Sequence, residues 1–232
     1  MNKKLWLTTA GTVVLIALAY FFLFNQKAED QAPEFSVKTV QQASELYEVD
    51  IKYPQFNGLK KLNDSIYSLV YNKLSETLDE GSDRLPLVFM VDWDSSQISP
   101  EYVSFSLHFY SFLGGAHGIN EIYAFNYDIK EDKEISLTEF LNNSQESLDT
   151  LSLLAKQQVI EQLKANDWET DGFTGEMITE GTQPVWENYQ HFNFTQDSLI
   201  VFFQQYQVAP GAVGEIIVNI DKNELQSKYF NN

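Results

Sequence analysis

Along much of the chain, hydrophobic and polar side chains alternate with a period of two, which is typical of β-strands that bury one face. The first stretch predicts a hairpin that ends at Pro54 and Gly58, and the others predict antiparallel strands joined by short turns. The breaks include residues 94–100 and the Gly114-Gly115 pair. The stretches with strand character are residues 35–53, 87–93, 102–112, 119–129, 192–203 and 214–220.

Two segments carry apolar residues at helical spacing, residues 59–78 and 148–163, and each predicts an amphipathic helix. A short third helix is expected from Asp221. Residues 164–190 are rich in glycine and are expected to form a long loop with one helical turn near Trp186. Strands interrupted by two helices predict an α+β fold, in which an antiparallel sheet carries the two main helices.

The N-terminus differs from the rest of the chain. Lys3 and Lys4 precede an uncharged run at residues 5–24, which has the length of a transmembrane helix. The run is longer than the apolar region of a usual cleaved signal peptide, so we favour an uncleaved signal anchor over a cleaved signal. The lysines before the run orient the chain with its bulk outside the cytoplasm.

This pattern divides the chain into three parts. Residues 1–27 are a cytoplasmic stub and a transmembrane anchor, and residues 28–34 form a polar linker. Residues 35–232 form the extracytoplasmic domain, which the breaks allow to be divided into subdomains 35–85 and 86–232.

Charge and cysteine content exclude several classes of function. The chain has 15 basic and 33 acidic residues and a net charge of −18, which disfavours nucleic acid as a partner. Removal of residues 1–27 takes away three lysines and no acid, so the exported part would carry 12 basic and 33 acidic residues, a net charge of −21. The absence of cysteine excludes disulfides, thiolate metal sites and cysteine nucleophiles.

The most distinctive local feature is the stretch Gly114-Gly115-Ala116-His117-Gly118, which follows a very aromatic strand. Its glycines allow a close backbone approach, so His117 could meet a ligand there. Equally, the glycines could form a bulged hairpin in which His117 donates to a carbonyl. The three histidines lack the spacing of metal ligands, and no nucleotide-binding or serine-hydrolase motif occurs, so we predict no metal site and no cofactor.

Several segments, in order along residues 45–226, resemble the extracytoplasmic domain of RsiV-type bacterial proteins. The opening is Tyr47 to Pro54 followed by Leu62-Asn63, and the closing motif is the stretch that begins at Gln205. Between them lie Gly115-Ala116-His117, the sequence Ala-Phe-Asn-Tyr-Asp at residues 124–128, the stretch at 135–141, and Phe194-Thr195.

The resemblance implies binding rather than catalysis. In the anti-sigma factor RsiV the domain binds lysozyme as a sensor, and in a peptidoglycan deacetylase it is a non-catalytic module. Only four residues precede the apolar run here, so the resemblance does not extend to anti-sigma activity, and no deacetylase domain is expected either. The expected ligand-binding residues are Gly114, Gly115, His117, Tyr206, Pro210 and Gly214.

The sequence therefore predicts an anchored binding or sensing module of the bacterial cell envelope, held by the inner or cytoplasmic membrane. The expected ligand is a cationic protein such as lysozyme, or the glycan of peptidoglycan. One alternative is an envelope hydrolase with His117 as general base. Another is a structural partner of a second envelope protein, contacted through residues 166–190.

Overall fold

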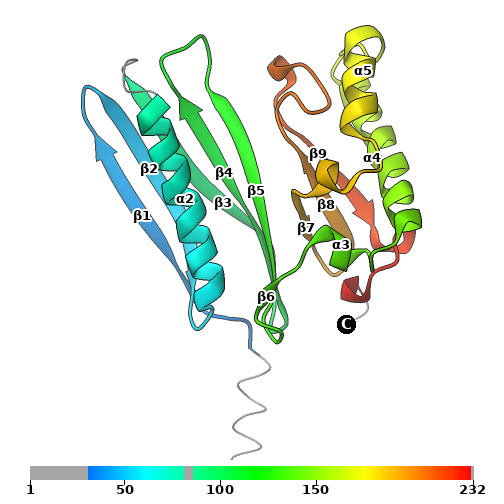
Figure 1. The fold of residues 1–232 in the computed structure, drawn as a ribbon, viewed down its shortest axis with the longest axis horizontal. Coiled ribbons are helices and arrows are strands. Elements are labelled where there is room, and N and C mark those ends of the chain that lie inside the picture. The colour runs from blue at the N-terminus through cyan, green and yellow to red at the C-terminus, as the bar shows by residue number, and fades with distance from the viewer. Residues whose placement is uncertain (1–30, 81–85, 231–232) are drawn as a thin grey trace, which may run out of the picture.

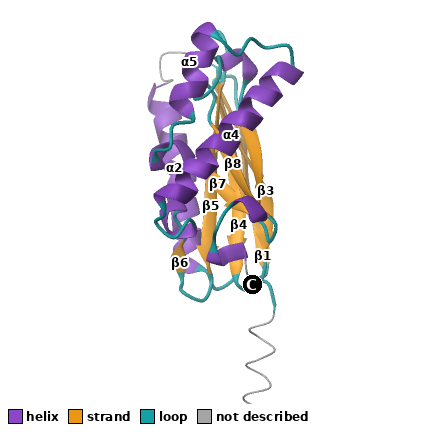
Figure 2. Cartoon of the chain, turned by 90° about the vertical axis from the view of Figure 1, so that its right-hand side faces the viewer, coloured by secondary structure: helices purple, strands orange, loops and turns teal. Residues whose placement is uncertain are grey.

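The computed structural model describes residues 31–80 and 86–230. Two sheets lie next to each other, with α2 on one and α4 on the other (Figure 1). The first sheet has the order β1-β2-β3-β4-β5-β6, and the second has the order β7-β8-β9. Figure 2 shows α4 running along the strands of the second sheet, with α5 at one end of the molecule.

The first sheet is built from the predicted N-terminal hairpin and the three aromatic-rich strands. Its strands are β1 (Phe35–Ala43), β2 (Tyr47–Phe56), β3 (Leu87–Ile98), β4 (Tyr102–Phe112), β5 (Ile119–Asp128) and β6 (Lys133–Glu134). All neighbours are antiparallel except β2 and β3, which are parallel. The prediction of a single antiparallel sheet is therefore wrong on two counts, because this sheet is mixed and a second sheet exists.

The parallel pair follows from the position of α2 (Lys60–Glu80) in the chain. The helix carries the chain back to the end of the sheet where β2 began, so β3 runs in the same direction as β2. A short turn would have produced an antiparallel neighbour. The helix buries Leu62, Ile66 and Val70 against the sheet, in one core with Phe105 and Leu107 of β4.

The second sheet consists of β7 (Phe192–Phe194), β8 (Ser198–Phe203) and β9 (Ile216–Asp221), all antiparallel. Its core lies under α4 (Gln145–Ala165), whose first turn is capped by the Ser144 hydroxyl accepting from the Ser147 N–H at 3.1 Å. The remaining helices are α3 (Leu137–Phe140), α5 (Gly172–Gly181) and the 3₁₀ turns η1 (Trp186–Tyr189), η2 (Gly211–Val213), η3 (Lys222–Glu224) and η4 (Lys228–Phe230).

The α+β class and both main helices are confirmed, but the helices do not share one sheet. Two local predictions are also corrected. Residues 164–190 contain the helix α5 in addition to the turn at Trp186, because Ile178 gives this glycine-rich segment a buried apolar anchor. Residues 94–100 are not simply a break, since β3 continues to Ile98 through a register shift between Ser95 and Gln97.

Two predictions concern how the chain is divided, namely the N-terminal anchor and the subdomain boundary at residue 85. The transmembrane anchor at residues 1–27 lies outside the described residues, and no described helix is long and apolar enough to cross a membrane. The boundary at residue 85 separates β2 from its hydrogen-bonded neighbour β3. The two hydrophobic cores divide later, since the first reaches Tyr127 and the second begins at Ile135.

A buried polar junction joins the two sheets. Asn193, in the middle of β7, is fully buried, and its side-chain amide donates to the carbonyls of Phe105 (2.9 Å) and Phe125 (3.2 Å) in the first sheet. In return, Asn126 of β5 donates to the Phe192 carbonyl at 2.6 Å. Ser104 of β4 accepts from the Phe194 N–H at 2.9 Å and donates to the Asn126 side-chain carbonyl at 2.7 Å.

The junction predicts a large effect of Asn193→Ala on stability. Because the substitution takes a hydrogen-bond donor away from buried acceptors of the first sheet, we expect the free energy of unfolding to fall by about 2–3 kcal/mol. Urea denaturation of the full chain measures it. Asn72→Ala, on the exposed side of α2, is the matched control and should cost less than about 0.5 kcal/mol. An equally small effect of Asn193→Ala would contradict a stabilising role for the junction.

Candidate functional site

The structure brings together the two segments that carry the sequence-predicted site residues. The turn with Gly114, Gly115 and His117 follows β4, and the segment with Tyr206, Pro210 and Gly214 follows β8. The Tyr206 hydroxyl lies 3.5 Å from Nε2 of His117, and Nδ1 of His117 lies 2.9 Å from the Gly118 carbonyl oxygen. Both side chains are exposed, so this contact lies on the surface at one end of the molecule.

The local backbone explains how Tyr206 reaches His117. Tyr206 has a φ of 72°, an uncommon conformation for a residue with a side chain. Its ring lies over Gly211, where an added Cβ would be 2.1 Å from the ring. Gly211 thus supplies the space for the ring. Pro210 and Gly214 flank this turn, and no hydrogen bond from either to His117 is among the contacts of the described residues.

The chain next to Tyr206 binds the edge of β5. The side-chain carbonyl of Gln204 accepts from the Ile122 N–H at 2.9 Å, and its amide donates to the Ile122 carbonyl. Gln205 accepts from the Asn120 N–H at 3.3 Å and donates to the Gly211 carbonyl at 2.8 Å. The two glutamines occupy the places that a neighbouring strand would take and hold the 204–214 segment against the first sheet.

Beside these glutamines lies a pocket of about 420 Å³ between α2, β5 and the second sheet. Most of its walls are polar, and they come from segments far apart in the chain. The lining residues are Lys73, Glu76, Thr77, Glu80, Ser111, Leu113, Ile119, Asn120, Glu121, Tyr123, His191, Gln204 and Gln205.

A charged cluster forms one wall of the pocket. Lys73 of α2 contacts both carboxylate oxygens of Glu121, at 2.9 and 3.1 Å, and its ammonium lies 5.3 Å from the centre of the Tyr123 ring. The Tyr123 hydroxyl donates to Glu121 at 2.8 Å. Burial disfavours the charge on Lys73, but the hydrogen bonds to Tyr123 and Glu121 outweigh it, so the pKa of Lys73 is raised. This wall is rigid and already paired.

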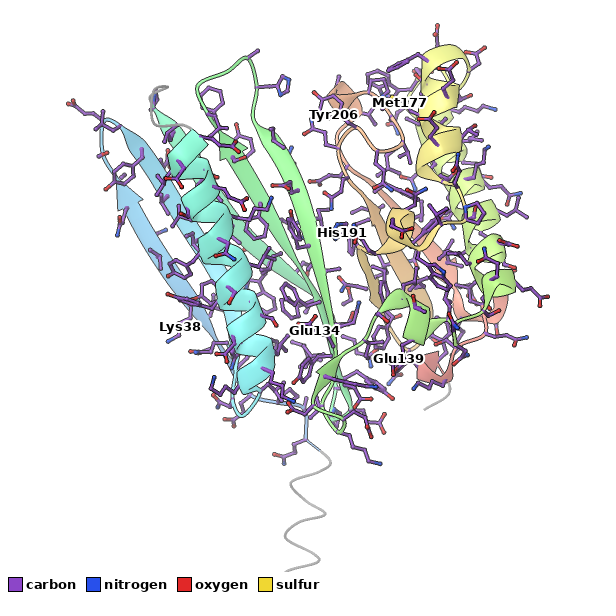
Figure 3. The ribbon with its side chains drawn as sticks, viewed as in Figure 1. Lys38, Glu134, Glu139, Met177, His191 and Tyr206 are labelled. Carbon is purple, nitrogen blue, oxygen red and sulfur yellow. The ribbon has the colours of Figure 1, made fainter. Side chains whose placement is uncertain are left out.

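His191 lies next to this cluster in the pocket and differs in having no such pairing. Figure 3 shows it between the two sheets. Its ring stands edge-on to Tyr123, with the ring centres 5.3 Å apart, and its backbone carbonyl accepts from the Phe202 N–H at 2.9 Å. Within residues 31–80 and 86–230, no hydrogen bond to its ring nitrogens is found. Burial lowers the pKa of His191, partly offset by the charge of Glu121, so the neutral ring is favoured.

Sequence reasoning did not find this pocket, because its residues share no local pattern. One signal was present in the sequence. Lys73 lies at helical spacing from Ile66 and Val70, on the apolar stripe of α2, where a charged residue requires a partner. Its partner Glu121 is separated from it by 48 positions. No group of three His, Asp or Glu side chains in the described residues is arranged to hold a metal ion.

The chain matches two known families in succession, and the change from one to the other, between residues 120 and 138, lies close to the boundary between the two hydrophobic cores. Residues 40–120, which lie in the first sheet with its helix, match a family described as "Deacetylase PdaC". Residues 138–223, which hold the second sheet, match a "Protein of unknown function (DUF3298)" family. Two separate segments of the chain thus match two families, which agrees with the expected resemblance to part of a peptidoglycan deacetylase. The narrower RsiV-type assignment stays a prediction.

Two curated proteins are similar in sequence. Peptidoglycan-N-acetylmuramic acid deacetylase PdaC of Bacillus subtilis is 25% identical over 206 residues, which covers 86% of this chain and 43% of that protein. Esterase Rv3036c of Mycobacterium tuberculosis is 27% identical over 120 residues, 51% of this chain and 48% of that protein. The chain therefore spans less than half the length of each relative.

Two solved structures share the fold. A DUF3298 family protein from Pseudomonas aeruginosa PAO1 has a TM-score of 0.64 at 17% identity, covering 88% of this chain and 98% of that one. A DUF3298 family member from Bacteroides fragilis has a TM-score of 0.56 at 14% identity, covering 84% and 92%. Similarity at this level of identity establishes the architecture and leaves the ligand open.

The environment of His191 predicts its titration. Its pKa in the folded chain should lie below the ordinary value of about 6.5, and Glu121→Gln should lower it further by removing a nearby negative charge. NMR titration of the three histidine rings measures both effects. Because the folded pKa is depressed, stability should fall as the pH decreases from about 6.5 through that pKa. His191→Gln should remove this component, and an unshifted His191 pKa would contradict the assignment.

Proposed function

We propose that this chain is a binding module of the bacterial cell envelope and that its pocket takes a segment of cell-wall glycan. The observation that carries the proposal is the pocket of about 420 Å³ in which the His191 ring stands without a protein hydrogen-bond partner among the described residues. A neutral imidazole offers one N–H donor and one acceptor nitrogen. This is the pairing that an acetamido group or adjacent hydroxyls of an amino sugar require.

The other walls fit the same kind of ligand. Asn120 and Ser111 add polar side chains, and Tyr123 adds an aromatic ring that is already fixed by Glu121. A fixed aromatic ring with surrounding polar groups contributes contact area without a large loss of conformational entropy. Lys73 is the one cation of the lining, whereas Glu76, Glu80 and Glu121 are acidic, so a neutral sugar is favoured over a polyanion.

The relatives support an envelope role. The Bacillus subtilis relative is named as a deacetylase of peptidoglycan, and the family matched by residues 40–120 is named after a deacetylase PdaC. We propose that this chain binds the same polymer, peptidoglycan, and we do not propose that it deacetylates it. We further propose that residues 1–27 anchor the chain in the cytoplasmic membrane with residues 35–232 outside, as the uncharged run and its flanking lysines predict.

Calorimetry of the full chain in detergent, with tetra-N-acetylchitotetraose and with purified muropeptides, tests the proposal. We expect binding that His191→Ala weakens about tenfold, since a hydrogen bond to the ligand is worth about 1.4 kcal/mol. Gln157→Ala, at an exposed position of α4, is the control and should bind like the unchanged chain. Absence of binding to both probes, or equal binding by the His191 and Gln157 variants, would refute the pocket as a glycan site.

A cationic protein is a second candidate ligand, because a specific surface favours it. The segment from the end of α4 through α5 exposes two aromatic side chains, Trp168 (37% exposed) and Phe173 (70% exposed). Exposed acids lie near them in the sequence, namely Asp167, Glu169, Asp171 and Glu176. Aromatic anchors within a rim of one charge are typical of protein-binding surfaces. The same segment is the one that the structural-partner alternative uses.

Lysozyme is the probe for this surface. We expect binding at low salt that weakens steeply as salt is added, and that Phe173→Ala reduces at least tenfold by removing the exposed anchor. Surface plasmon resonance with the full chain measures both. Leu153→Ala, which removes another exposed apolar side chain from α4, is the control. Glycan binding that depends on His191, without lysozyme binding, would favour the glycan. Lysozyme binding that depends on Phe173, without glycan binding, would favour the protein.

The hydrolase alternative finds less support in the geometry. A general base at His117 requires a carboxylate to orient it, and the contacts of its ring are with the Gly118 carbonyl and the Tyr206 hydroxyl. A serine and a histidine do meet on β4, where the Ser106 hydroxyl lies 2.9 Å from Nε2 of His108. Ser106 is only 3% exposed, so its hydroxyl does not face a substrate. We therefore propose no catalytic residue.

A further inference from the structure

The edges of the two sheets are treated in two different ways. Side chains bind the backbone of three edges. Gln204 binds β5, Asn126 and Ser104 bind β7, and Gln158 and Gln162 of α4 bind β9 at 2.7–2.9 Å. The fourth long edge is β1, on the far side of its sheet from β5 (Figure 1). In the described part of the chain, no side chain hydrogen-bonds to the backbone of this outer edge.

The register of the hairpin identifies the unpaired groups. The Asn57 N–H donates to the Glu34 carbonyl and the Ser44 N–H to the Tyr47 carbonyl, each at 2.8 Å. In an antiparallel pair, hydrogen-bonded residues alternate with residues whose groups point away. The even-numbered residues of β1 therefore bond to β2. The N–H and C=O groups that point outward belong to Phe35, Val37, Thr39, Gln41 and Ala43.

Nothing in the sequence of β1 protects this edge well. The strand pairs with β2 over all nine residues without a bulge, contains no proline, and exposes every residue except Val40, which is half-buried. Phe35 and Val37 are 41% and 46% exposed. Natural edge strands usually carry several protective features, so a long regular edge on which a single lysine is the only one is a site of strand pairing. Lys38 is its one charged residue.

Beyond the proposed binding function, we propose that β1 pairs with β1 of a second copy of this chain, antiparallel about a twofold axis at Thr39. The charge of the protein restricts the place at which two copies can meet. The chain carries 33 acidic residues, so two copies repel each other over most of their surface, but β1 contains no acid. A self-complementary strand also satisfies the requirement of a twofold dimer that both copies use the same surface.

A twofold axis at Thr39 pairs the outward-pointing N–H and C=O groups of one β1 strand with those of the other. Residue 37 faces 41 of the partner and 35 faces 43, so each outward N–H meets an outward C=O. Lys38 then stands opposite Val40 and not opposite the second Lys38, and no carboxylate lies within the paired strands. Figure 3 shows Lys38 far from His191 and Tyr206, so the pairing leaves the pocket open in both copies.

The absence of cysteine allows a test by crosslinking of the full chain in detergent. In Thr39→Cys, hydrogen-bonded counterparts have Cα atoms about 5.5 Å apart, within disulfide range, and mild oxidation should yield mostly covalent dimer. Gln41→Cys is the matched control on the same strand and face. Its copies would be about 14 Å apart, so it should yield little dimer alone, but it should crosslink to Val37→Cys when the two variants are mixed.

A second variant removes the pairing itself. Thr39→Pro deletes an N–H that points outward and leaves the bonds to β2 in place, so the chain should still fold, as circular dichroism can verify, and should sediment as a monomer. Ser75→Cys, on the exposed side of α2, gives the background yield of random crosslinking. Equal dimer yields at positions 39, 41 and 75 would overturn the proposal, as would a monomeric unchanged chain.

Discussion

The need to hydrogen-bond the backbone at strand edges shapes this molecule more than any other constraint. Two sheets meet where β7 crosses β4 and β5, and the edge of β7 would bury unpaired peptide groups there. Asn126 and Ser104 of the first sheet supply the missing partners, and Asn193 of β7 donates in turn to two carbonyls of the first sheet; each of the three is 4% exposed or less. A buried peptide group without a partner costs as much as several favourable contacts return, so these three polar side chains determine how the sheets are placed.

The same interaction produces the candidate site. Gln204 and Gln205 bind the backbone of β5 just beyond the junction, and in doing so they place the 204–214 segment beside α2 and His191. The pocket thus forms where these glutamines bind the edge of β5, and residues from both halves of the chain line it. On one side of it Lys73, Glu121 and Tyr123 are paired with one another, whereas the His191 ring has no hydrogen bond among the described residues. A site between two packed units is a common place for a ligand.

The two matched families correspond to the two cores, and the pocket draws residues from both. Neither half alone contains Lys73 together with His191. A binding function located at this seam therefore requires both halves in one chain, joined through the polar junction. Acidic surface elsewhere adds long-range attraction for cations and repulsion between copies, which leaves the acid-free strand β1 as the surface where two copies can meet.

Local sequence patterns determined the elements, because periodicities of two and of 3.6 report which face of a strand or helix is buried. Both main helices, the N-terminal hairpin and the strands near the glycine turn follow from them. The meeting of His117 with Tyr206, the parallel pairing of β2 with β3, and the pocket required the tertiary structure. Their partners lie 40 to 89 positions apart, and nothing in a local pattern encodes which edge a distant side chain will cap.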